Sequence, residues 1–153
     1  MVATDRSKSA DYAVAWAAEL AERYDAELLL LQILVPQNPP GTEAGAAEAT
    51  RASYAAEDLK RFAEELAGPR GRARVVVDED VSRAIIDAVE AEEVDVVVVG
   101  NVGMSGRKEF LLGNVPNRVS HNARCTVVIV NSAEAGAAAE EKRGVGRLFR
   151  RER

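Results

Sequence analysis

Cysteine and histidine, which supply many catalytic and metal sites, are almost absent from this sequence. Its 153 residues include one cysteine, Cys125, and one histidine, His121. A single cysteine excludes an internal disulfide framework, and the two residues cannot provide the four ligands of a structural zinc site. We expect His121 to be a structural or surface residue and Cys125 to be a buried, inert thiol. No nucleophile stands beside a base in a recognisable pattern, so the sequence gives no support for efficient catalysis.

Long apolar runs are also absent. No run reaches the roughly 18 residues that a membrane-spanning helix requires, and no signal-peptide pattern is present at the start. We therefore expect an intracellular protein, located in the cytoplasm. Because 47% of the residues are hydrophobic and 153 residues is an ordinary domain length, we expect one domain with a buried core.

The net charge of −5 conceals an uneven distribution of charge. Residues 142–153 contain six basic residues and one acidic residue, so they carry +5, and residues 1–141 carry −10. We expect a folded domain over residues 1–132 and a flexible basic tail or linker stub over residues 133–153. The tail lacks the interleaved aromatic residues of single-strand binders, so we expect neither nucleic acid nor a membrane as a partner.

Runs of β-branched and aliphatic residues alternate with helical patterns. Residues 96–99 are four valines, which is typical of a parallel strand covered by helices on both faces. The expected strands are residues 1–4, 28–35, 73–77, 94–99 and 126–130. Strict alternation of strands and helices favours an α/β fold, an open parallel sheet with helices on both faces. Ligands of such sheets bind beyond the carboxyl ends of the strands, where the strand order reverses.

The expected helices are residues 10–24, 50–67, 81–92 and 114–123. The spacing of apolar residues places Tyr54 on the buried face of the second helix. Residues 36–49, rich in proline, glycine and alanine, are expected to form a long loop or lid, with disorder favoured. Residues 78–80 are all acidic, and we expect a solvated loop and a helix cap there, with a metal site as the alternative.

One segment combines glycines with the start of a helix. The fourth expected strand leads into Gly100 and Gly103. Nine residues separate Gly103 from Gly113, which precedes Asn114, the start of the last expected helix. Glycines let consecutive backbone N–H groups face an anion, and a helix start adds free N–H groups and partial positive charge. A phosphate chain would fit between the first glycine pair, Gly100 and Gly103, and the start of that helix. The spacing matches neither a Walker A motif nor a dinucleotide fingerprint, and an ordinary strand-to-helix loop is the alternative.

This glycine pattern, Gly-x2-Gly-x9-Gly followed by a polar residue, resembles the nucleotide-binding motif of the universal stress protein family. The opening Val-Ala-Thr-Asp-Arg-Ser of residues 2–7 is similar to that family's Val-x-Thr-Asp-x-Ser segment. Residues 26–31 and 123–130 resemble the family's second and last strands, so the resemblance covers roughly residues 1–131. It implies a five-stranded parallel sheet of order 3-2-1-4-5, as in adenine nucleotide alpha hydrolase-like folds.

The resemblance also implies a ligand and its contacts. Family members of the ATP-binding type hold ATP where the first and fourth strands meet, so we expect ATP or another adenine nucleotide, with Mg²⁺ or Mn²⁺ as its counter-ion. Asp5 is the expected metal ligand. Ile33 is expected to contact adenine through its backbone. The expected nucleotide-binding residues are Thr4, Asp5, Ile33, Gly100, Gly103, Gly113 and Asn114.

Two residues depart from the family pattern. Asn114 stands where the family usually has serine or threonine, which keeps a polar donor and loses a hydroxyl, so a mono- or cyclic nucleotide is an alternative to ATP. Arg6 occupies a position often held by a small residue, where it either reaches a phosphate or lies in water.

The resemblance implies a regulatory protein that acts through an unidentified protein partner. The apolar strand 126–130 would lie at the sheet edge and invites pairing with a second copy, so we expect a homodimer. The alternatives are a stress protein that acts by protein contact without a nucleotide, and a weak ATPase.

Overall fold

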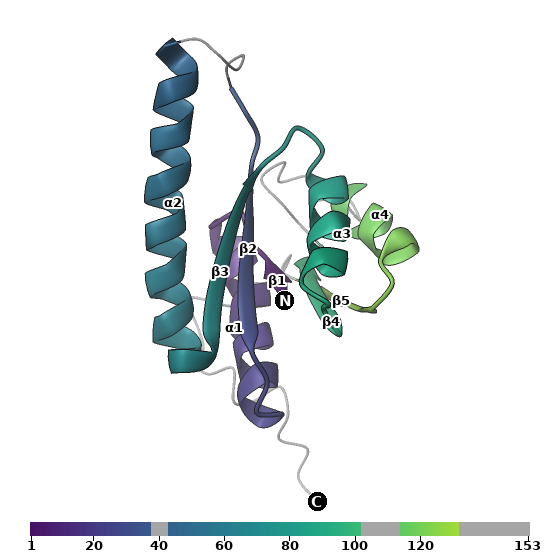
Figure 1. Cartoon of the computed structure of the whole chain (residues 1–153). Helices are drawn as coiled ribbons and strands as arrows, with labels where there is room; N and C mark the ends of the chain where they lie inside the picture. Colours follow the sequence, from purple (N-terminus) through teal and green to yellow (C-terminus); the bar gives the residue numbers. More distant parts are fainter. Residues whose placement is uncertain (38–42, 102–113, 132–153) are drawn as a thin grey trace, which may run out of the picture.

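The computed structural model describes residues 1–37, 43–101 and 114–131 (Figure 1). A five-stranded parallel sheet has the order β3-β2-β1-β4-β5, which confirms the predicted α/β fold and strand order. The strands are β1 (Val2–Ala3), β2 (Leu28–Leu34), β3 (Gly71–Val77), β4 (Val96–Gly100) and β5 (Thr126–Val130). The helices are α1 (Lys8–Arg23), α2 (Glu43–Ala67), the short 3-10 helix η1 (Gly68–Arg70), α3 (Val81–Ala91) and α4 (Asn114–Asn122).

Helices cover both faces of the sheet, and each face has its own core. Leu30 and Val98 pack against α1 and α2, whereas their neighbours Leu31 and Val97 pack against α3 and α4. Successive side chains of a strand point to opposite faces, so a strand that is apolar at every position requires a helix on each side. Complete burial of a leucine such as Leu30 contributes about 1.5–3 kcal/mol, which makes these central strands the main source of stability.

Local contacts fix where the helices begin and how closely one of them approaches the sheet. Ser7 caps α1, because its Oγ accepts a hydrogen bond from the N–H of Ala10 (3.2 Å). Asp80 caps α3 in the same way through the N–H of Arg83 (3.1 Å). Gly71 begins β3 directly against α2, where a Cβ atom would lie 2.0 Å from the carbonyl oxygen of Ala63. Only glycine permits that approach.

The second helix begins earlier than the sequence pattern indicated. α2 begins at Glu43, so the expected loop over residues 36–49 is helical from residue 43 onward. Alanine and glutamate dominate that part of the segment, and both favour helix. α2 extends well beyond the end of β3 (Figure 1). Tyr54 is 70% exposed, so its predicted inward position is wrong.

Candidate functional site

The pairing of the strands places several of the expected site residues at one level of the sheet. Val2 of β1 pairs with Leu30 of β2 and with Val98 of β4. Two residues further along these parallel strands, Thr4 therefore lies level with Gly100. The N–H of Thr4 donates to the carbonyl of Leu31 (2.9 Å), so the pairing with β2 continues past the end of β1. β1 and β4 are adjacent where the strand order reverses, which is where open α/β sheets bind ligands.

The turn between β1 and α1 is held by its own side chains. Thr4 is buried, and its Oγ1 accepts a hydrogen bond from the N–H of Arg6 (3.0 Å). Asp5 is half-buried, and its Oδ1 accepts from the N–H of Ser7 (2.9 Å). The Asp5 carboxylate thus lies just before the start of α1, where the helix dipole stabilises negative charge. The turn positions one carboxylate at the carboxyl edge of the sheet.

Arg6 has an unusual backbone and a defined side-chain contact. Its φ angle is 61°, in the left-handed region that costs a non-glycine residue roughly 1–2 kcal/mol. Its guanidinium lies over the ring of Phe62 in α2, 4.0 Å from the ring centroid. A cation–π contact at an exposed site contributes about 0.5–1 kcal/mol, which offsets part of that cost. Arg6 is exposed, in agreement with the prediction that it lies in water, and its guanidinium also stacks on an aromatic ring. A contact with a phosphate stays a prediction.

The backbone N–H and C=O of Ile33 face β1, the strand beside which the strand order reverses. The carbonyl of Leu31 accepts from Thr4 on the β1 side, whereas that of Leu34 accepts from Asp78 on the β3 side. Backbone groups alternate between the two neighbouring strands, so the N–H and C=O of Ile33 face the β1 side. They point past the end of β1, toward the turn that carries Asp5. The Ile33 side chain itself is half-buried in the core against α3 and α4.

The fourth strand and the last helix flank the glycine segment. Gly100 is the final residue of β4 rather than part of a loop, and it pairs with Val130. α4 begins at Asn114, as predicted, with Pro116 buried in its first turn, where a missing N–H is tolerated. Gly103 and Gly113 lie outside the described residues, as do the basic residues of the same segment and residues 133–153.

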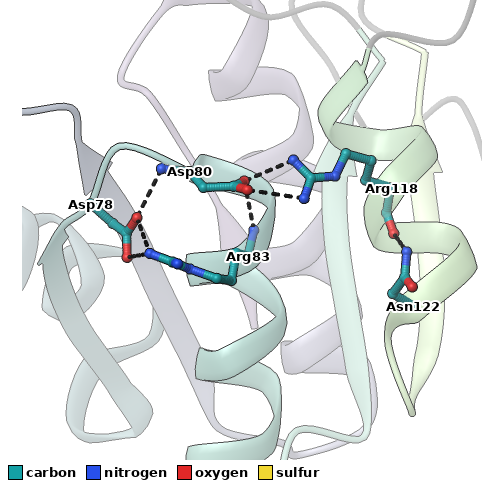
Figure 2. Close-up of polar contacts among 5 residues, drawn as sticks. All are labelled: Asp78, Asp80, Arg83, Arg118 and Asn122. Atoms are coloured by element: carbon teal, nitrogen blue, oxygen red, sulfur yellow. Dashed lines mark hydrogen bonds and ion pairs between the residues drawn. The ribbon is translucent and has the colours of Figure 1, made fainter.

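A network of two aspartates and two arginines joins the end of β3 to α3 and α4 (Figure 2). Both carboxylate oxygens of Asp78 accept from one nitrogen of Arg83, Nη2 (2.8 and 2.9 Å). Asp80 instead accepts from both terminal nitrogens of Arg118 in α4, one to each oxygen (2.9 and 3.0 Å). The N–H of Asp80 donates to Asp78 (2.8 Å). Donation from this N–H and from Arg83 lowers the pKa of Asp78. Donation from Arg118 and from the Arg83 N–H lowers the pKa of Asp80.

The network confirms the predicted helix cap and gives no support to the metal alternative. Within the described parts of the chain, no three histidine, cysteine, aspartate or glutamate side chains are placed to hold a metal ion. The aspartates instead neutralise two arginines. Sequence reasoning missed Arg118, because no local pattern connects it to Asp80, 38 residues earlier.

A groove of about 510 Å³, also missed from the sequence, lies beyond the ends of β2 and β3. It is lined by Pro36, Gly45, Glu48, Ala49, Val77, Asp78, Glu79 and Arg83. The early turns of α2 form one wall, held to the chain after β2 by a hydrogen bond from Arg51 to the Val35 carbonyl (3.1 Å). The volume is within the usual range for small-molecule pockets, roughly 300–1,000 Å³. The only feature of the sequence that could have indicated this groove was the helix propensity of residues 43–49.

His121 and Cys125 are the remaining residues singled out in the sequence. His121 is exposed near the end of α4, as expected. Cys125 is half-buried rather than fully buried, and desolvation raises the pKa of its thiol, which favours the protonated form. None of the helices in the described residues has the length and apolar character needed to cross a bilayer.

Comparison with known proteins agrees with this geometry. The sequence profile of the universal stress protein family matches residues 1–131. A universal stress protein of Mycobacterium tuberculosis is 32% identical over 140 residues, which cover 86% of this chain and 94% of that protein. A universal stress protein of Mycolicibacterium smegmatis is 29% identical over 90% of this chain, which spans only 49% of that relative.

A solved structure gives the same result. A universal stress protein crystallised in complex with cAMP has a TM-score of 0.63 and 27% identity, with 86% of this chain and 94% of that one covered. Sequence and fold thus agree over nearly the whole described chain. Because the family profile covers residues 1–131, this chain belongs to the universal stress protein family.

Proposed function

We propose that this chain is an adenine-nucleotide-binding regulatory protein that acts as a homodimer in the cytoplasm. The observation that carries the proposal is the meeting of the Thr4–Ser7 turn, Gly100 and the Ile33 backbone where the strand order reverses. A ligand beyond this edge would contact residues from three strands at once. The relative crystallised with cAMP supports an adenine nucleotide as the ligand.

The Ile33 backbone suits adenine in particular. Its N–H is a donor and its C=O is an acceptor, and both point past the end of β1. Adenine presents a matching pair, the N1 acceptor and the N6 amino donor. Guanine presents the opposite pair at the corresponding positions, so its binding would leave polar groups unpaired, which is costly in a partly buried site.

The ribose and phosphates would then lie toward Asp5 and α4. We propose that Gly103, Gly113 and Asn114 complete this part of the site with Thr4 and Gly100. The half-buried Asp5 supplies one carboxylate whose Oδ1 is already engaged by Ser7. Mg²⁺ is commonly held by one or two carboxylates together with substrate phosphates and waters. A lone carboxylate therefore fits an Mg²⁺ or Mn²⁺ ion that arrives with the phosphates.

Isothermal titration with ATP, AMP, cyclic AMP, adenosine and GTP tests the binding proposal, together with native mass spectrometry of the purified protein. Asp5→Asn keeps the acceptor that holds Ser7 and removes the charge, so we expect it to lose about tenfold or more in ATP affinity in the presence of Mg²⁺. Asp11→Asn, an exposed change on α1, is the matched control and leaves affinity unchanged. The proposal fails if no adenine nucleotide co-purifies or binds.

The dimer proposal rests on β5. This strand is at the edge of the sheet, and its residues Val127–Val130 are half-buried. The N–H of Thr126 donates to Asp95, and the Val130 carbonyl accepts from Asn101. By alternation, the N–H groups of Val127 and Ile129 point away from β4 and are available to a second copy.

Light scattering of a Val127→Pro variant tests the dimer. Proline removes one outward N–H at an edge position where it is tolerated. We expect a monomer that still unfolds cooperatively. A wild-type protein that is monomeric at high concentration would exclude the dimer.

A stress protein that acts by protein contact without a nucleotide is the second candidate. Asn114 favours it, because the side chain lacks the hydroxyl found at this position in the ATP-binding type. The titration distinguishes the two candidates directly. A weak ATPase would instead release phosphate in a metal-dependent reaction that Asp5→Asn abolishes.

A further inference from the structure

α4 borders the proposed phosphate site and is held to the rest of the fold in two ways. Its inner face is packed: Pro116 is buried, and Val119 lies in the core that includes Ile85 of α3. Its outer face is joined to the β3–α3 turn by Arg118 (Figure 2). Ridge-and-groove packing sets the angle between two helices only to within about 15–20°, so the second attachment adds a constraint on where the first turn of this nine-residue helix lies.

The ion pair between Arg118 and Asp80 has a defined geometry. Both carboxylate oxygens of Asp80 meet both terminal nitrogens of the guanidinium, at 2.9 and 3.0 Å. Such a planar fork fixes orientation as well as distance, which a lysine ammonium cannot do. Asp80 is itself fixed, because it caps α3 and its N–H donates to Asp78.

The direction of the contact also matters. Long side chains on a helix lean toward its N-terminus, so the Arg118 side chain lies over the turn that begins at Asn114. The backbone carbonyl of Arg118 accepts a hydrogen bond from the Asn122 side chain (2.7 Å), which links Arg118 to the last turn of α4 as well. The Asp80–Arg118 pair therefore holds the start of α4 in register with the β3–α3 turn.

We propose that Arg118 and Asp80 are positioning residues for the nucleotide phosphates, acting through the N-terminus of α4. This inference rests on the proposed function, because it assigns the phosphate contacts to the Asn114 end of the helix. Displacement of α4 would weaken the contacts that phosphates make and leave those of the base unchanged, since the base lies against Ile33. The signature is a loss that grows with the number of phosphates.

Arg118→Lys is the decisive variant. It keeps the positive charge and removes the fork, so a simple field effect of the charge predicts no change. We expect the affinity for ATP to fall at least about fivefold, the affinity for AMP to fall less, and that for adenosine to stay within twofold. Arg83→Lys is the matched control, because it makes the same substitution at the arginine that binds Asp78 in this network and does not touch α4. It leaves all three affinities unchanged.

Hydrogen exchange of the nucleotide-free proteins adds a readout that needs no ligand. The α4 amides of Arg118→Lys should exchange faster than those of the wild type and of Arg83→Lys. If the wild type binds ATP and Arg118→Lys binds it equally well, or if adenosine affinity falls as much as ATP affinity, the positioning role is excluded. If the wild type binds no nucleotide, the proposed function fails, and unchanged α4 exchange in Arg118→Lys would separately exclude the positioning of α4.

Discussion

Replacing Gly71 with alanine should destabilise the protein severely, and the reason is visible at the contact between β3 and α2. The new Cβ atom would lie 2.0 Å from the Ala63 carbonyl oxygen and 2.4 Å from its carbon. Both obstructing atoms are helix backbone, so no side chain can rotate out of the way. α2 would have to move until the distance of 2.0 Å grew to about 3.4 Å, the onset of ordinary contact.

That movement would open the interface where Leu59 and Ala63 are fully buried. Overpacking of a core typically costs about 1–3 kcal/mol, and a backbone obstacle places this variant at the upper end. Alanine also restricts the unfolded chain, which returns about 0.4–1 kcal/mol. We therefore expect the free energy of unfolding to fall by about 2 kcal/mol or more, measured by urea denaturation followed by circular dichroism.

Gly68→Ala is the control, because it introduces backbone strain without a steric clash. Gly68 has a φ of 56°, but a Cβ atom there would meet nothing within 4 Å. We expect it to lose only about 1 kcal/mol from backbone strain. If the free energy of unfolding of Gly71→Ala lies within about 0.5 kcal/mol of the wild-type value, the close approach of β3 to α2 is wrong. A difference of about 0.5 kcal/mol is smaller than any overpacking cost of this kind.

Three further predictions follow from single contacts. Arg6→Ala loses the stacking on Phe62 and keeps the unfavourable φ, so calorimetry should show a loss of about 0.5–1 kcal/mol; Arg6→Gly should be the more stable of the two variants. Because burial raises the pKa of the Cys125 thiol, iodoacetamide should label the folded protein at neutral pH more slowly than the unfolded protein, as followed by mass spectrometry. The pKa values of Asp78 and Asp80 are lowered in the folded protein. The stability that the two carboxylates contribute is therefore complete above an ordinary carboxyl pKa of about 4 and is lost as the pH falls through the lowered values. In Asp80→Asn, the midpoint of urea unfolding should decline less steeply below about pH 4 than in the wild type.

The glycine segment and the Thr4–Asp5 sequence could be named from the sequence because they lie at or just after the end of an expected strand. Ile33, inside the second expected strand, was named through the family resemblance. The ends of parallel strands share one edge, so the topology alone brings such residues together. The roles of Asp5, Ile33 and the glycines stay predictions. The direction of the Ile33 backbone could not be predicted, because it depends on where β1 ends relative to β2.

Other features depended on contacts between distant segments. α2 begins at Glu43 although the nearby prolines favoured a loop, and its extension creates a wall of the groove at Glu48. Tyr54 is exposed because Ala52 and Ala55 are the half-buried residues of this stretch, on the face that continues to the buried Leu59. Two helical faces are compatible with the apolar residues here, and only the packing of α2 decides which of them is covered.

The sequence by itself determined the alternation of strands and helices, the burial of the valine and leucine strands and the order of the sheet through its family resemblance. The alternation and the burial follow from local propensity and from the two-sided burial of a parallel sheet, whereas the strand order came only from the resemblance. Only the tertiary structure decided that Arg6 stacks on Phe62, that Gly71 meets Ala63 and that Arg118 binds Asp80. The first and last of these contacts join residues far apart in the chain, and the second joins α2 to the strand that follows it. Each exists only once the sheet has brought its helices, strands and turns together.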